Sequence, residues 1–305
     1  MNKIPILGAA LAAAAILTGT SSGATAVSPF PSPTVGDIFV AAQTVTTDGA
    51  LASWFTPGSS VVFRAYAVNP KTHKIVDPKT VRYFYVTIPG QPNVKLKYAA
   101  TAPGASTGMP WSGVWQVPAS YTEGTVNFRI LIQVKGTAGK QLKGQFVQLP
   151  VVPSQLTISS TAPPPYEPAV PAGNAGAGTG QSLDLALYVD TVNGTGPIGV
   201  AKRPIGCTQT NVYKRGEQVV VRAWGTDLAT GDVLTNDNIN GAHVSVAGMP
   251  DAPLNYGAHG VVYFWSAPFN IPASYPLGAT TIHVVFTTES GKTGTFDYSI
   301  NVIPS

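Results

Sequence analysis

The sequence predicts an all-β protein made of two tandem antiparallel β-sandwiches with about seven strands each. Three observations lead to this prediction. β-Branched and aromatic residues alternate with polar ones at period two, turn-forming residues interrupt these runs every 8–12 residues or so, and the second part of the chain repeats the first. Beyond the N-terminal segment, helical periodicity is always broken by proline or glycine within a dozen residues or so. A helical or mixed fold is therefore not expected.

The N-terminal segment has the features of a secretory signal peptide. Lys3 precedes an uncharged, largely apolar run from Ile4 to Leu17, and Ala24-Thr25-Ala26 fits the small-x-small cleavage pattern. The run is shorter than the roughly 20 residues that span a bilayer. We expect residues 1–26 to be removed, leaving a secreted or periplasmic chain without stable membrane insertion; an uncleaved anchor is the alternative.

A tandem duplication follows from aligning the chain with itself. With a shift of 158 positions, residues 58–66 (GSSVVFRAY) match 216–224 (GEQVVVRAW), and 12 of the 43 residues from 58 to 100 are identical. With the shift reduced by four positions, to 154, residues 118–121 and 272–275 both read PASY. Both copies close with Val-x-Pro-Ser, at Val151 and Val302. The repeat predicts one domain at 27–158 and a second at 183–305.

Within each copy the predicted strands alternate with turns. Runs at 61–67, 83–88 and 126–134 in the first copy, and at 219–224 and 282–288 in the second, have strand composition. Turn signals stand at 56–58, 69–70, 89–90, 135–136 and 290–292. Between the copies, residues 159–182 begin with a proline-rich part and end with a Gly/Ala-rich part, which predicts a semi-rigid spacer followed by a hinge.

Two segments resemble a known domain family. Residues 213–223 (YKRGEQVVVRA) and 227–234 (DLATGDVL) are similar to the start of strand B and the following hairpin of secreted bacterial immunoglobulin-like and macroglobulin-like domains, and Trp115 to Gly124 resembles their E–F corner. The resemblance implies tandem immunoglobulin-like β-sandwiches and carries no catalytic residues. The Cys-Gly-Glu-Gln thioester of macroglobulins and the Cys…Trp…Cys frame of antibody domains are absent from the sequence.

The composition provides little material for catalysis. One cysteine excludes an intrachain disulfide framework, a cysteine-rich zinc module and an iron–sulfur cluster, and only four histidines and 14 carboxylates are present. No serine lies in a Gly-x-Ser-x-Gly elbow. We therefore predict that the protein is not an enzyme and holds no cofactor or metal.

Cys207 lies in a segment that only the second copy has. About eleven extra residues fall within 193–211 and include Lys202 and Arg203, which predicts either a binding loop with a crosslinking thiol or an ordinary insertion around a buried cysteine. Together with His243, His259 and Met249, Cys207 has the composition of a copper site. Because the cysteine lies 36 residues before His243, the spacing does not support such a site, and the question stays open.

Aromatic residues are the candidate binding residues. Tyr66 and Trp224 occupy matched strand positions, each two residues after a matched arginine, and Trp111, Trp115 and Trp265 precede the Pro-Ala-Ser-Tyr corners. These rings could stack on sugars, or they could fill the two cores. The core interpretation is favoured because Trp111 and Trp115, four residues apart on one strand, share a face that is normally the buried one.

Charge separates the two copies. Residues 27–158 contain 11 Lys/Arg and 4 Asp/Glu, whereas residues 183–305 contain 6 and 9. The basic copy favours an anionic glycan or envelope surface, or the acidic copy of a second molecule, which would give an oligomer. An exported chain without an aromatic-basic reader motif is not expected to bind nucleic acid.

These observations favour a secreted or periplasmic binding or scaffold protein that contacts a protein or the cell envelope. A carbohydrate-binding module that uses the aromatic clusters, and an accessory subunit of a secreted enzyme, are the alternatives.

Overall fold

The computed structural model of the protein describes residues 34–98, 109–136, 139–148, 150–151, 154–166, 175–176, 183–195, 203–259 and 262–305. Within these residues the chain forms mainly antiparallel sheets and a single short 3-10 helix at Pro78–Thr80, so the predicted all-β class is confirmed. The predicted signal peptide, residues 1–26, lies outside the described residues. No helix in the described part of the chain is long and apolar enough to cross a bilayer.

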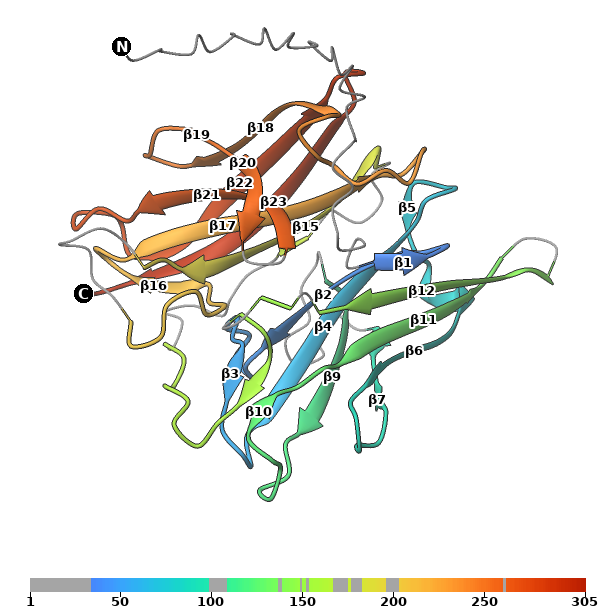
Figure 1. Cartoon of the computed structure of the whole chain (residues 1–305), viewed down its shortest axis with the longest axis horizontal. Coiled ribbons are helices and arrows are strands. Elements are labelled where there is room, and N and C mark those ends of the chain that lie inside the picture. Colours follow the sequence, from blue (N-terminus) through green and yellow to red (C-terminus); the bar gives the residue numbers. More distant parts are fainter. Residues whose placement is uncertain are drawn as a thin grey trace, which may run out of the picture.

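The strands divide between an N-terminal and a C-terminal half (Figure 1). The N-terminal half contains β1 (Thr34–Gly36), β2 (Phe39–Val45), β3 (Trp54–Phe55), β4 (Ser60–Asn69), β5 (Lys74–Ile75), β6 (Val81–Thr87), β7 (Val94–Lys95), β8 (Lys97–Tyr98), β9 (Trp111–Gln116), β10 (Gly124–Thr125), β11 (Arg129–Lys135), β12 (Gln141–Val147) and β13 (Thr157–Ile158). The C-terminal half contains β14 (Ala175–Gly176), β15 (Leu185–Asn193), β16 (Val212–Lys214), β17 (Gln218–Asp227), β18 (Ile239–Val246), β19 (Ala252–Pro253), β20 (Asn255–His259), β21 (Val262–Asn270), β22 (Gly278–Thr288) and β23 (Thr293–Ile303).

Both halves have the same strand order. One sheet of each half runs β12-β11-β6-β7 or β23-β22-β18-β19, and the other runs β2-β4-β9-β8 or β15-β17-β21-β20. Every named strand pairing in the described residues joins strands of one half. The duplicated topology agrees with the repeat seen in the sequence, while the domain boundaries at 27–158 and 183–305 stay a prediction.

The two copies differ where they end. In the C-terminal half β23 is continuous, and Val302 lies opposite Tyr213 in a parallel pairing with β16. In the N-terminal half, β12 ends at Val147 and the matching parallel pairing with β3 is made by Thr157–Ile158. The alignment of Val151 with Val302 is therefore wrong in register, because the first copy interrupts its last strand between residues 147 and 157.

The cores follow the period-two pattern. Alternate residues of each strand face inward, so Phe84 and Val86 of β6 and Val244 and Val246 of β18 are buried. Phe63 and Phe128 meet edge to face across the N-terminal sandwich, with ring centroids 4.9 Å apart.

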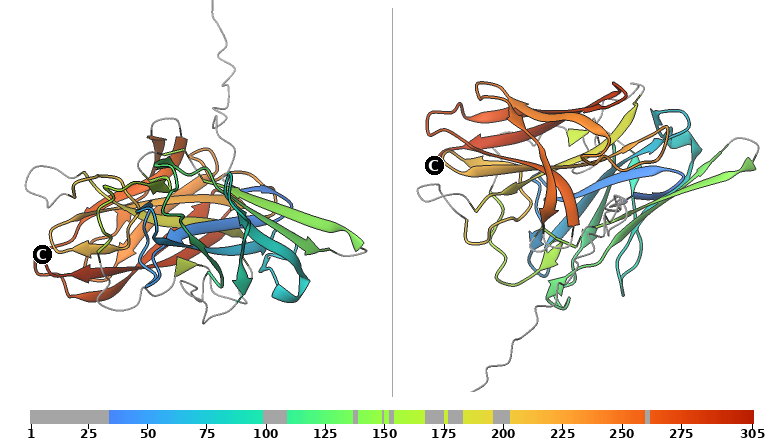
Figure 2. Two further views of the ribbon diagram at one scale, coloured as in Figure 1. Left: turned by 90° about the horizontal axis from the view of Figure 1, so that it is seen from below. Right: turned by 45° about the horizontal axis from the view of Figure 1, so that its top comes forward.

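The halves pack against each other through the sheets that contain β2 and β15. Both strands are buried along their whole length, because one face covers the core of its own half and the other faces the opposite half. Figure 2 shows the halves side by side in two further views. Gln43 Nε2 donates to the carbonyl of Val189 (2.9 Å), and the hydroxyl of Tyr66 donates to the carbonyl of Leu187.

An arginine from each half is buried in this interface. Arg64 donates from Nε and Nη2 to Oε1 of Gln43, at 2.9 and 2.7 Å, and Arg222 donates to both carboxylate oxygens of Asp190, at 2.7 and 2.6 Å. Burial lowers the pKa of Arg64, which has only an amide partner. Burial acts in the same direction on Arg222, but Asp190 outweighs it and raises the pKa of this guanidinium.

The interrupted strand end and the insertion of the second copy both contribute to this interface. Ser154 accepts a hydrogen bond from Nη1 of Arg222 (2.7 Å) and donates one to the carbonyl of Cys207 (2.8 Å). Thr210 forms an isolated antiparallel bridge with Ala52. The segments that differ between the copies thus lie where the copies meet.

The described start of the spacer is packed onto the C-terminal half. The ring of Tyr166 lies 4.1 Å from the guanidinium of Arg203, and its hydroxyl donates to Glu217 (3.2 Å). Residues 159–166 are therefore not the free spacer that their proline content predicts, because an aromatic side chain anchors them.

Replacing Asp190 by alanine would leave Arg222 buried without its carboxylate. We expect Asp190→Ala to lower the free energy of unfolding by about 3–5 kcal/mol, measured by urea denaturation. Asp297→Ala, which removes the exposed partner of His283, should cost less than about 1 kcal/mol. If both variants lost the same free energy of unfolding, burial of the Arg222–Asp190 pair would not make its removal more costly.

Candidate functional site

The matched residues Tyr66 and Trp224 do not form open platforms. Tyr66 has no exposed surface and Trp224 is 8% exposed, because both rings lie between the two halves. Tyr66 contacts Phe296 of the opposite half, with ring centroids 6.4 Å apart. Stacking of a ligand on these two rings would require the halves to separate.

Trp111, Trp115 and Trp265 are buried within the two cores. Trp111 lies edge to face with Phe84 (5.2 Å between centroids), and the indole N–H of Trp265 donates to the carbonyl of Leu234 (2.8 Å). Their burial agrees with the core interpretation, and a role in binding stays a prediction.

Arg203 is held in a structural network. It donates to both carboxylate oxygens of Glu217 and to Oγ1 of Thr210, and it stacks on Tyr166. These partners use most of its donors, so the side chain anchors the spacer to the insertion. Lys202 lies outside the described residues.

Cys207 and His259 line the same hollow, which has a volume of about 570 Å³ and also reaches Arg222 and Phe264. His243 instead lies exposed on β18, in the other sheet of the C-terminal half, and Met249 packs against the core. The described residues contain no group of three or more His, Cys, Asp or Glu side chains that could hold a metal ion.

Replacing a tryptophan by alanine distinguishes the two interpretations, because loss of a core tryptophan lowers the free energy of unfolding and loss of an exposed binding tryptophan does not. We expect Trp111→Ala and Trp265→Ala each to lower the free energy of unfolding by about 3–5 kcal/mol, because each leaves a large cavity. Val114→Ala, at a position on the same strand as Trp111 that is 44% exposed, should change it by about 0.5 kcal/mol or less. Full stability of the tryptophan variants in urea would contradict the core assignment.

The best candidate for a binding site is the outer face of the sheet β12-β11-β6-β7. It lies on the side of the N-terminal half that faces away from the C-terminal half in Figures 1 and 2. We call it the tyrosine face. Its residues share one side of the sheet by their register: Tyr83, Tyr85, Thr87, Lys95, Arg129, Leu131, Gln133, Lys135, Gln141, Lys143, Gln145 and Val147.

Two tyrosines form the aromatic part of this face. Tyr83 and Tyr85 are alternate residues of β6, both half-buried, with ring centroids 5.0 Å apart and planes inclined by 38°. Across the sheet, Tyr85 lies opposite Leu131 and Tyr83 opposite Gln133. The rings thus stand beside one apolar and one amide side chain on the outer face of the sheet.

Cations surround the tyrosines. Lys95 lies directly opposite Tyr85 on β7, and Arg129 and Lys143 are exposed on the next two strands. The strands β6, β7, β11 and β12 contain no Asp or Glu. Asp37 lies at the sheet edge, where its carboxylate accepts a hydrogen bond from the backbone N–H of Lys143 (3.3 Å) without forming an ion pair with the lysine side chain.

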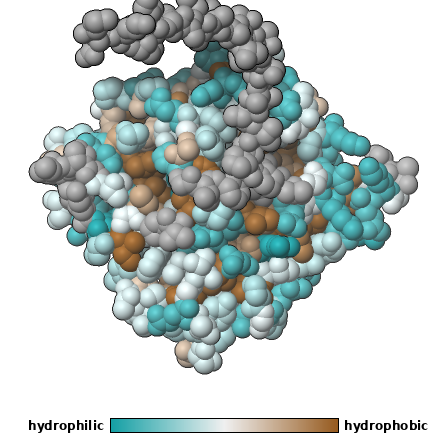
Figure 3. All heavy atoms as spheres, in the orientation of Figure 1, coloured by the Kyte–Doolittle hydropathy of each residue, from teal (hydrophilic) through white to brown (hydrophobic). Residues whose placement is uncertain are grey.

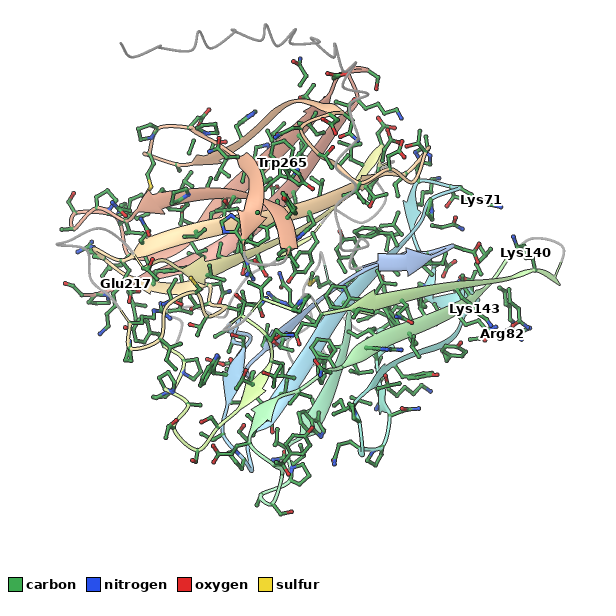
Figure 4. All side chains as sticks on the ribbon, viewed as in Figure 1. Lys71, Arg82, Lys140, Lys143, Glu217 and Trp265 are labelled. Atoms are coloured by element: carbon green, nitrogen blue, oxygen red, sulfur yellow. The ribbon has the colours of Figure 1, made fainter. Side chains whose placement is uncertain are left out.

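The cationic surface continues to one end of the sheet. Figure 4 shows Arg82, Lys140 and Lys143 near this end, and Figure 3 shows the same end as hydrophilic surface; Lys71, between β4 and β5 of the other sheet, lies on the same side of the molecule. Arg82 is exposed at a β-bulge, where the register shifts between Gln133 and Val134.

The equivalent face of the C-terminal half is different. Gly241 and His243 take the positions of Tyr83 and Tyr85, and His283 takes that of Arg129. Its strands β18, β19, β22 and β23 contain one Asp and no Lys or Arg. Since the buried positions of the two sheets stay apolar, the copies have diverged on the outer side.

The strand composition of residues 83–88 does not by itself mark a site. The signal in the sequence is the contrast between copies, because Tyr83 and Tyr85 alternate with the inward Phe84 and Val86 and are absent from the second copy. A half-exposed aromatic pair at outward positions offers apolar ring surface to a ligand. Binding by ring stacking needs no nucleophile, acid–base group or metal ligand.

Comparisons with known proteins give no family. No protein-family model matches the chain, and no curated protein matches it. Among solved structures, it is similar to SGBP-B of the Bacteroides ovatus mixed-linkage glucan utilization locus, in complex with a mixed-linkage heptasaccharide, at 11% identity and a TM-score of 0.18. The match covers 85% of this chain and spans 44% of the other. A TM-score this low carries neither fold nor ligand over to this protein.

Proposed function

We propose that the protein is an exported, non-catalytic carbohydrate-binding protein whose tyrosine face holds a polysaccharide chain. The observation that carries this proposal is the pair Tyr83–Tyr85, which stands half-exposed on an outer sheet face beside cationic side chains. Sugar rings have apolar faces and hydroxyl edges, so an aromatic ring flanked by hydrogen-bonding side chains suits them.

The shape of the site supports a polymer rather than a small molecule. The tyrosine face lies across four hydrogen-bonded strands, and neighbouring strands are about 4.8 Å apart. Gln141 and Gln145 lie on the outer side of β12, beside a chain that crosses the tyrosines. Gln133 is buried and donates to Oε1 of Gln141, so it positions that amide. The two amides of β12 can contact consecutive sugars.

The packing of the two halves supports the choice of this face. The sheets that contain β4 and β17 are used for the contact between the halves, so their matched aromatic residues are covered. The outer faces of the sheets β12-β11-β6-β7 and β23-β22-β18-β19 are not used in this contact. Of these two faces, as far as the structure describes them, the N-terminal one carries a tyrosine pair and the C-terminal one does not. The C-terminal half acts in this proposal as a rigid support.

Removing both rings tests the proposal. We expect Tyr83→Ala/Tyr85→Ala to weaken retention of the protein on insoluble polysaccharides by at least about tenfold, since each stacked ring contributes on the order of 1 kcal/mol. The measurement is a depletion isotherm on a panel of insoluble polysaccharides. Tyr85→Trp should keep the affinity within a few-fold, because it keeps an aromatic surface.

Tyr263→Ala is the matched control, because Tyr263 is 39% exposed but lies in the C-terminal half. Its retention should equal that of the unmodified protein. Circular dichroism and thermal unfolding confirm that the double variant is folded at the assay temperature. Unchanged retention of a folded double variant would refute the tyrosine face as the binding site.

A further inference from the structure

We infer that the polysaccharide recognised by the tyrosine face is anionic, with carboxylate, sulfate or phosphate groups that the surrounding lysines and arginines bind. This inference rests on the proposed function and adds the chemical class of the ligand. The strands of the face contain five cationic residues, Arg82, Lys95, Arg129, Lys135 and Lys143, and no carboxylate.

The exposed cations of the N-terminal half have no carboxylate partner among the described residues. In the C-terminal half, by contrast, Arg203, Arg222 and Lys292 pair with Glu217, Asp190 and Asp227. Unpaired cations on one face repel one another, and a polyanion would relieve that repulsion.

The register places charge next to the rings. Lys95 stands one strand from Tyr85 on one side, and Lys143 stands two strands from Tyr83 on the other, with Gln133 between them. With strands about 4.8 Å apart, a chain that stacks on the tyrosines passes cations on both sides. Arg129, opposite Thr87 and one outward position beyond Leu131 on β11, has the planar fork that binds carboxylate or phosphate through two hydrogen bonds.

The end of the sheet extends the same surface. Arg82 and Lys140 continue the cationic surface beside Lys143, as Figure 4 shows. A neutral ligand would gain little from these positions, whereas a polyanion longer than the tyrosine pair would contact them. The equivalent face of the C-terminal half, which has no Lys or Arg in its strands, provides no such path.

A membrane surface fits these observations less well. Among the described residues, the large apolar side chains that are clearly exposed are Tyr98, Val114, Tyr263 and Leu277, and none of them lies on the tyrosine face. Lipid binding at a bilayer surface usually combines cations with inserted apolar side chains. The tyrosine face offers two partly exposed rings instead.

The test compares one polymer with and without its charge. Binding of the mature chain to polygalacturonate and to its methyl ester is measured by affinity electrophoresis and by biolayer interferometry. We expect the ester to bind at least about tenfold more weakly than the acid. Raising NaCl from about 0.05 to about 0.5 M should weaken binding of the acid by about tenfold or more, because exposed charges are screened.

Charge variants assign the effect to the face. Arg129→Gln/Lys143→Gln should weaken binding of polygalacturonate by about tenfold and leave binding of the ester unchanged. Lys74→Gln/Lys97→Gln removes the same net charge from β5 and β8, in the other sheet of this half, and should bind within about twofold of the unmodified protein. Equal loss in both double variants would refute a specific role for the face.

The outcomes separate this inference from the proposed function. If acid and ester bind equally and Arg129→Gln/Lys143→Gln has no effect, the ligand is neutral and only this inference fails. If Tyr83→Ala/Tyr85→Ala binds both polymers like the unmodified protein, the proposed function fails. Binding of dextran sulfate but not polygalacturonate would assign sulfate as the anionic group. Binding only to phosphatidylglycerol vesicles, or to none of these probes, would refute both.

Discussion

The contact between the two halves is the constraint on which the rest of the structure depends. Each copy has two sheets, and each sheet has an outer face. The outer faces of the sheets that contain β4 and β17 pack against each other. Arg64 and Arg222 lie in that contact at equivalent positions, but only Arg222 has a carboxylate partner. Removing such ions from water is costly, and each guanidinium is therefore held by a partner of its own half. The contact between the halves adds hydrogen bonds from Gln43 to Val189 and from Arg222 to Ser154. What remains open to a ligand is the outer sheet of each half.

Duplication followed by divergence explains how one fold provides both support and recognition. The two halves share their strand order and keep apolar residues at inward positions, because an unpaired polar group there would be buried at a cost. Outward residues are free of this requirement. In the N-terminal half they became tyrosines and cations, and in the C-terminal half they became threonine, serine and histidine, with one aspartate. The charge difference between the copies is thus concentrated on surfaces of equivalent position.

The segments that break the repeat also have a structural explanation. The interruption between β12 and β13 brings Ser154 to Arg222, and the insertion before β16 brings Thr210 to Ala52. Each of these contacts is made by a segment that only one of the two copies has, so two identical copies would not form them in this way. The deviations from the repeat therefore belong to the interface. Arg203, whose predicted binding role stays a prediction, holds Tyr166 of the spacer and pairs with Glu217.

The sequence by itself determined the fold class, the duplication and the inward face of most strands, because these depend on local alternation and on turn residues. Trp111 and Trp115, for example, share one side of a strand whatever it packs against. It could not show that Tyr66 and Trp224 are covered, or that Tyr83 and Tyr85 are open, because all four stand at outward positions of their strands. Whether an outward residue meets solvent or another sheet depends on how the two halves dock, and that arrangement is a property of the tertiary structure alone.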